Sequence, residues 1–304
     1  SGKKKVDFTQ NYRTNGTTVR NTTISYYGID LDRAIDAGVD TELNRTAQYR
    51  EGIAGSSVID GLRLQTMTYF QGTVGEEKVD FTQNYRTNGT TVRNTTISYY
   101  GIDLDRAIDA GVDTELNRTA QYREGIAGSS VIDGLRLQTM TYFQGTVGEE
   151  KVDFTQNYRT NGTTVRNTTI SYYGIDLDRA IDAGVDTELN RTAQYREGIA
   201  GSSVIDGLRL QTMTYFQGTV GEEKVDFTQN YRTNGTTVRN TTISYYGIDL
   251  DRAIDAGVDT ELNRTAQYRE GIAGSSVIDG LRLQTMTYFQ GTVGEEKVDF
   301  TQNY

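Results

Sequence analysis

Aspartates form the densest group of possible metal ligands in this chain. Asp30, Asp32, Asp36 and Asp40 lie in one short stretch, and carboxylate oxygens are the ligands that hard cations such as Ca²⁺ prefer. Their spacing does not match an EF-hand loop, which needs oxygen ligands at nearly alternate positions, a central glycine and a terminal glutamate. A helix cap with a solvated acidic face explains them more simply. The candidate metal ligands, repeated along the chain, are Asp30, Asp32, Asp36, Asp103, Asp105, Asp109, Asp176, Asp178, Asp182, Asp249, Asp251 and Asp255.

The composition argues against catalysis. The chain has no His and no Cys, so the usual bases and nucleophiles reduce to carboxylates, Lys, Ser, Thr and Tyr. A glycosidase with paired carboxylates is formally possible, but the sequence singles out no pair. We therefore predict that the protein is not an enzyme and binds no cofactor.

Tyrosine is the residue type best suited to recognition in this sequence. Its aromatic body and polar tip could form surfaces that stack on carbohydrate or bind protein. We expect about half of the tyrosines to pack in the core instead. The tyrosines in question are Tyr12, Tyr26, Tyr27, Tyr49 and Tyr69, which recur along the chain.

The charge and the hydrophobic runs exclude two classes of partner. A net charge of −10 disfavours nucleic acid, because such binding depends on a surface of Lys and Arg. No apolar run approaches the roughly 18 residues needed to span a bilayer, so we predict no membrane insertion. Without cysteine there are no disulfides, and the sequence assigns no compartment.

The clearest local signal is a β-hairpin. Asn15 and Gly16 tolerate the positive φ angles of a type I′ turn, and they separate two strand-like runs. Pairing outward from this turn sets Tyr12 opposite Val19 but would then place Ile24 opposite Asp7. Because one extra residue restores the apolar register, we predict a bulge or an early end of pairing near residues 21–23.

The rest of the unit contains a stretch with helical spacing and two more strands. Leu31, Ile35 and Val39 fall four residues apart, with Asp30 as a possible N-cap and Gly38 as a possible C-terminal stop, which predicts a helix of about two turns. A looped excursion between strands is the alternative. Further strands are expected over 42–50 and 58–70, giving four strands per unit.

Exact repetition is the strongest feature of the sequence. The segment that begins at Lys5 recurs at residues 78, 151, 224 and 297, so the unit is 73 residues long (78 − 5). We divide the chain into a tag-like N-terminus (1–4), four repeats (5–77, 78–150, 151–223 and 224–296) and a partial fifth repeat (297–304) that duplicates strand one. A fainter similarity within the unit suggests an older duplication.

Two architectures fit four identical strand-rich units. A closed ring or β-propeller, with four large or eight small blades, would protect the sheet edges by radial repetition. A linear array of small β domains, each with a short helix, is the alternative. The duplicated strand one at both ends favours the ring, because a boundary cut through a sheet could be closed by either copy.

This pattern resembles engineered symmetric tandem-repeat proteins in the style of designer β-propellers, although no motif of a natural family is matched. The resemblance covers all four repeats and implies a non-enzymatic scaffold whose role is to fold and assemble. Its partner would be a second copy, through strand exchange at the duplicated terminal strand. The alternative is the repeat region of a cell-surface adhesin or carbohydrate-binding array, which would be extracellular.

Overall fold

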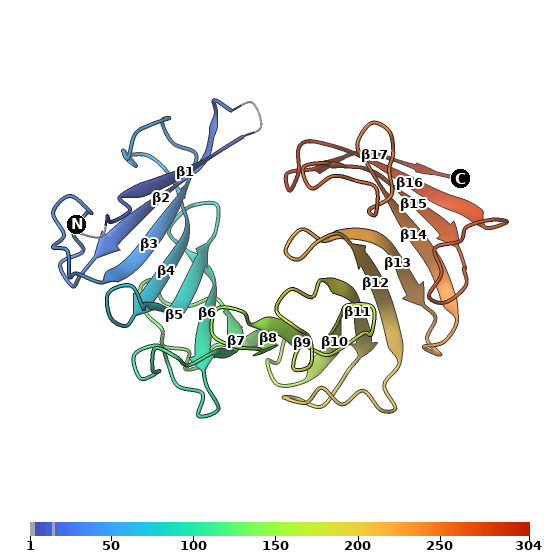
Figure 1. The fold of residues 1–304 in the computed structure, drawn as a ribbon, viewed down its shortest axis with the longest axis horizontal. Helices are drawn as coiled ribbons and strands as arrows, with labels where there is room; N and C mark the ends of the chain where they lie inside the picture. Colours follow the sequence, from blue (N-terminus) through green and yellow to red (C-terminus); the bar gives the residue numbers. More distant parts are fainter. Residues whose placement is uncertain (1–3, 14–15) are drawn as a thin grey trace. The chain divides into compact units, whose positions relative to one another are not determined.

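The computed structural model describes residues 4–13 and 16–304. The fold is mainly β, with 17 antiparallel strands in one open sheet and no helix among those residues (Figure 1). Consequently, no helix in the described ranges is long and apolar enough to cross a membrane. The chain divides into two compact units, which meet in sequence between residues 142 and 164.

Each repeat contributes four strands, as the sequence predicts. In the first repeat these are β1 (Phe8–Tyr12), β2 (Val19–Tyr27), β3 (Leu43–Arg50) and β4 (Leu64–Gln71). The same segments recur as β5 (Lys78–Tyr85), β6 (Val92–Tyr100), β7 (Leu116–Arg123), β8 (Leu137–Gln144), β9 (Lys151–Tyr158), β10 (Val165–Tyr173), β11 (Leu189–Arg196), β12 (Leu210–Gln217), β13 (Lys224–Tyr231), β14 (Val238–Tyr246), β15 (Leu262–Arg269), β16 (Arg282–Gln290) and β17 (Lys297–Asn303).

Repeat boundaries are ordinary strand pairs. In the first unit β4 pairs with β5, so that Tyr69 lies opposite Phe81, and in the second unit β12 pairs with β13 in the same register. The sheet therefore continues from one repeat to the next. The expected array of separate small domains, each with a helix, is wrong, because strand one of each repeat completes the sheet of the repeat before it.

The expected closed ring is also wrong. In the described part of the chain β1 pairs only with β2, and β17 pairs only with β16. Both are edge strands, each with one side unpaired. The duplicated strand thus provides two edges and no closure.

The first hairpin confirms the predicted change of register. Tyr12 lies opposite Val19 and Phe8 opposite Ile24, so the apolar side chains share a face along the whole pair. Arg20 is the extra residue, which places the bulge one position before the predicted range. Its carbonyl oxygen leaves the ladder and accepts the backbone N–H of Glu51 at 2.9 Å.

The equivalent turn in the second repeat differs from the predicted type. Asn15 lies outside the described residues, but its equivalent Asn88 does not take a positive φ, whereas Gly89 does (74°). Gly89 N–H donates to the carbonyl of Arg86 at 2.9 Å, and the Asn88 side-chain oxygen accepts the N–H groups of Thr90 and Thr91. The asparagine therefore stabilises a longer loop through its side chain.

A loop replaces the predicted helix after β2, as the alternative expected. Leu31 takes a left-handed φ of 61°, which an α-helix of L-residues cannot accommodate. The conformation is held because Tyr27 and Asp32 exchange two backbone hydrogen bonds of 2.9 Å. Helical geometry is limited to one turn, in which Ala37 N–H donates to the Arg33 carbonyl at 2.9 Å.

The two faces of the sheet differ in chemistry. On one face Phe81, Ile97 and Ala120 lie in a row across β5, β6 and β7, and they are 6%, 0% and 0% exposed. The opposite face is polar, with Thr82 paired with Thr96 in a row of hydroxyl side chains. This arrangement follows from the period-two alternation within each strand.

Candidate functional site

Strand one of each repeat is the element to which the long loops attach. A glutamine makes the first attachment: Gln83 is fully buried, and its amide nitrogen donates to the carbonyls of Ile126 (2.8 Å) and Ser129 (3.1 Å). Its carbonyl oxygen accepts the N–H of Gly128 at 2.8 Å. One side chain therefore fixes the loop between β7 and β8 onto β5. Gln156 and Gln229 make equivalent bonds in later repeats.

An ion pair makes the second attachment. Asp80 is 8% exposed and accepts from Arg106 Nε at 2.9 Å, and Arg106 belongs to the loop between β6 and β7. Lys78 Nζ donates to the carbonyl of Thr114 in the same loop at 2.7 Å. Charge-assisted bonds of this kind are stronger than neutral ones, so β5 orients both long loops of its repeat.

The last strand, β17, has the same sequence but lacks these attachments. Every residue of β17 is exposed; Phe300 is 46% exposed, whereas its equivalent Phe81 is 6% exposed. Asp299 accepts from Gln290 at 3.0 Å, and Gln302 accepts from the Tyr304 hydroxyl at 3.0 Å. We identify the free edge of β17 as the candidate interaction site, because an interior strand is exposed there.

A second recurring feature is an arginine among tyrosines on the apolar face. The guanidinium of Arg45 lies over the ring of Tyr26, with Cζ 5.5 Å from its centroid, and its Nε is buried without a hydrogen-bond partner. Burial, together with the neighbouring Tyr26, raises the pKa of Tyr49 to about 12. Burial, together with Tyr69, likewise raises the pKa of Tyr85 to about 12, although Arg45 opposes the shift. Equivalent arginines are Arg118, Arg191 and Arg264.

The tyrosines singled out from the sequence fall into two groups. Tyr27 is 6% exposed, and its hydroxyl donates to the carbonyl of Val6 at 2.7 Å, so it is part of the core. Tyr26, Tyr49 and Tyr69 are half-buried and flank the Arg45 side chain. Tyr12 is 42% exposed in the edge strand β1. Part of each half-buried side chain therefore stays exposed to solvent, as does that of Tyr12.

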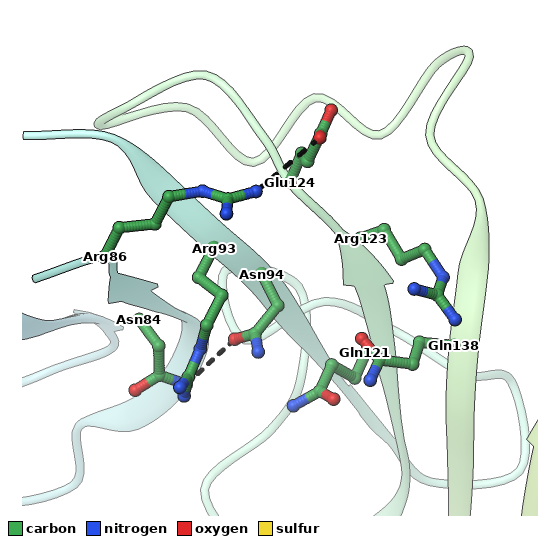
Figure 2. A pocket seen from close by; sticks show the side chains of 8 residues that line it. All are labelled: Asn84, Arg86, Arg93, Asn94, Gln121, Arg123, Glu124 and Gln138. Carbon is green, nitrogen blue, oxygen red and sulfur yellow. Dashed lines mark hydrogen bonds and ion pairs between the residues drawn. The ribbon is translucent and has the colours of Figure 1, made fainter.

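A polar pocket of about 510 Å³ opens beside β5, β6 and β7 in the first unit (Figure 2). Asn84 donates to Asn94 at 2.9 Å across two strands, and Arg86 pairs with Glu124 at 3.9 Å above them. These last two side chains are 53% and 71% exposed, so solvent screens their charges. The pocket is a polar hollow in the surface, lined also by Arg93, Gln121, Arg123 and Gln138.

The candidate aspartates lie in the loop between β2 and β3. Asp30 and Asp36 are exposed, while Asp32 is half-buried and uses its backbone to pair with Tyr27. Within residues 4–13 and 16–304, no group of three or more His, Cys, Asp or Glu side chains is arranged to hold a metal ion. Cation binding by these aspartates stays a prediction.

Sequence reasoning missed the glutamine and arginine positions. Gln10 lies between Phe8 and Tyr12 on the apolar face of strand one. Arg45 likewise lies between Leu43 and Ala47 on the apolar face of strand three. A polar residue at an apolar position of a period-two pattern is the signal that identifies both. Such a residue must find partners when it is buried.

Comparison with known proteins gives little further. No family model matches the chain, and no curated protein sequence matches it. A solved structure titled "Crystal Structure of TcdB2-TccC3-Cdc42" is similar with a TM-score of 0.28 and 7% sequence identity, over 94% of this chain and 15% of that chain. The chain thus spans a small part of that protein's length, and a likeness at this level supports no inference about fold or function.

Proposed function

We propose that this protein is a non-enzymatic, engineered symmetric scaffold that folds by repetition of a four-stranded unit and assembles with copies of itself through its sheet edges. One observation carries the proposal: β17 has the sequence of strands that pair on both sides elsewhere in the sheet, but it lies at the edge with one side unpaired. β17 repeats the sequence of β5, yet Phe300 is 46% exposed where Phe81 is 6% exposed. Such an edge is a template for another strand.

The scaffold role predicts that whole repeats can be removed without disturbing the rest. Deleting residues 78–150 brings β4 next to a strand identical to β5, so every remaining neighbour keeps its partner. We expect a folded chain whose thermal unfolding midpoint is close to that of the parent, because the stability of repeat proteins depends on neighbouring elements. Circular dichroism with thermal melting measures this.

The control deletion removes two strands and keeps the antiparallel directions. Deleting residues 78–113 removes β5 and β6 and places β4 beside β7, which abolishes the pairing of Phe81 with Tyr69 and Ile97. We expect this chain to lose cooperative unfolding. If both deletions behaved alike, strand sequence would not determine the order of the sheet, and the scaffold proposal would fail.

The carbohydrate-binding alternative has one observation in its favour. Half-buried tyrosines flank an arginine in every repeat, and aromatic faces of this kind suit sugar rings. The chain has no tryptophan, so its fluorescence reports tyrosine directly. Titration with neutral and acidic oligosaccharides separates the two functions: a saturable change that is lost when all four equivalent tyrosines (Tyr26, Tyr99, Tyr172 and Tyr245) are replaced by alanine would support the alternative, and a flat titration would support the scaffold.

A further inference from the structure

We propose that copies of this chain join head to tail by strand replacement, in which β17 of one copy takes the place of β1 in the next and pairs with its β2. The interaction surface is the unpaired edge of β17, and the partner is a second copy of the chain. The inference rests on the assembly role proposed above and specifies how the copies meet.

The sequence makes the replacement chemically equivalent to the original. Residues 297–304 repeat residues 5–12, so each side chain of β17 has a counterpart in β1. In the native pair Phe8 lies opposite Ile24 and Thr9 opposite Thr23. A β17 strand in that place sets Phe300 opposite Ile24 of the second copy and Thr301 opposite its Thr23.

The replacement also supplies the partners that β17 lacks. Gln10 donates to the carbonyls of Ile53 (2.9 Å) and Ser56 (3.0 Å), and Asp7 accepts two hydrogen bonds from Arg33 (2.8 and 2.6 Å). These loop residues of a second copy become available to Gln302 and Asp299 when β1 leaves. The exposed Phe300 then lies between two strands, as Phe81 does between β4 and β6.

Simple addition of a second copy does not achieve this. β1 and β17 hold the same place in the repeat, so placing them side by side pairs two identical strands in parallel. If β1 and β17 are instead placed side by side in antiparallel orientation, the apolar face of the second copy points to the opposite side of the sheet. Neither arrangement occurs in this sheet, whose registered pairs are antiparallel with apolar faces aligned.

The balance of pairing favours replacement at high concentration. One strand pair is lost and one is gained, with the same side chains. β17 is already ordered by β16, whereas the released β1 recovers its backbone freedom, which is a gain in entropy. The short connection to β2 keeps β1 nearby as a competitor, so assembly should depend on concentration and on how firmly β1 is held.

Disulfide cross-linking tests the register, since the chain has no cysteine of its own. One chain carries Thr301→Cys and a second carries Thr23→Cys; they are mixed at rising concentration and oxidised. We expect a mixed dimer on a non-reducing gel. The matched control is Ser25→Cys in the second chain, because the backbone of Ser25 faces that of Asp7 and so lies two residues from Thr301 in the proposed register. It should cross-link about tenfold less, because disulfides tolerate only a narrow separation.

A second pair of variants changes the competition between the two strands. Phe8→Ser in the Thr23→Cys chain weakens β1 and should increase the mixed dimer about tenfold, whereas Phe300→Ser in the Thr301→Cys chain should reduce it about tenfold. If the chain stays monomeric in sedimentation even with Phe8→Ser, both the assembly role and the replacement fail. If oligomers form but Thr301→Cys links to itself, two β17 edges pair and the replacement alone is overturned.

Discussion

Replacing Gln83 with alanine is expected to destabilise the region around β5 by about 3 kcal/mol, whereas Gln302→Ala is expected to change stability by less than about 0.5 kcal/mol. Gln83 is fully buried and satisfies three backbone groups of the loop that follows β7. Each group that loses its partner while buried costs roughly 1–3 kcal/mol. Ile126 is 66% exposed, so part of the loop can turn to water, which places the expected cost near the lower end of the sum.

Hydrogen exchange measured by mass spectrometry tests this prediction locally. A chain of repeats need not unfold in one step, so a single unfolding midpoint would average over distant strands. The loop peptide around Gly128 has the same sequence in all four repeats, so one of its four copies should exchange faster in Gln83→Ala and split the mass envelope, whereas Gln302→Ala should leave that envelope unchanged. The control Gln302→Ala alters the same residue type at the same repeat position. Equal effects of the two substitutions would contradict the anchoring role of the buried glutamine.

The number of strands and the register of the first hairpin were predictable because they depend on local alternation, whereas the expected strand over 58–70 begins only at Leu64. Val19 and Ile24 lie an odd number of residues apart, so they can share the apolar face only if one extra residue lies between them. Arg20 is that residue. The helix prediction failed because its apolar spacing marks no buried face: Ile35 is 89% and Val39 60% exposed. The segment is fixed instead by the backbone pairing of Tyr27 with Asp32. The spacing of apolar residues does not predict this pairing.

Ring closure was not predictable from the residues. Identical repeats guarantee that every junction is alike, and the pairing of β4 with β5 confirms this. Whether a sheet then closes depends on the twist accumulated from strand to strand, which no single residue determines. The duplicated terminal strand favours a ring at the level of sequence, but in the structure its two copies form the two edges of an open sheet. The loop attachments were missed for a related reason, since the partners of Gln83 lie more than 40 residues away.

Raising the pH from 10 to 12 is expected to unfold the sheet. Burial, with a smaller contribution from the negative charge of Asp80, raises the pKa of Tyr100 to about 12. The hydroxyl is neutral in both states below pH 10, so stability there is unaffected. Above pH 10 the unfolded chain loses this proton first, and stability falls until the folded pKa is reached. A shift of this size corresponds to roughly 2 kcal/mol for this buried side chain.

The effect is large because it recurs. Six tyrosines that are only 6% exposed have a pKa of about 12, namely Tyr85, Tyr100, Tyr158, Tyr173, Tyr231 and Tyr246. Together their pKa shifts correspond to a loss of on the order of 10 kcal/mol in the free energy of unfolding, which matches the whole stability of a typical domain. Tyrosinate absorbance should lag behind that of free tyrosine and then rise together with the loss of β-sheet circular dichroism.

Tyr100→Phe separates the tyrosine contribution from that of other groups that titrate at high pH. The variant keeps the ring beneath Lys78 but loses the hydroxyl and its 2.7 Å bond to the carbonyl of Val79. It should therefore be about 1 kcal/mol less stable at neutral pH and less sensitive to alkali. The two stability curves should converge between pH 10 and 12. Curves that stayed parallel would contradict a role for the Tyr100 phenol in alkaline unfolding, because removing it would then have no effect on the pH dependence.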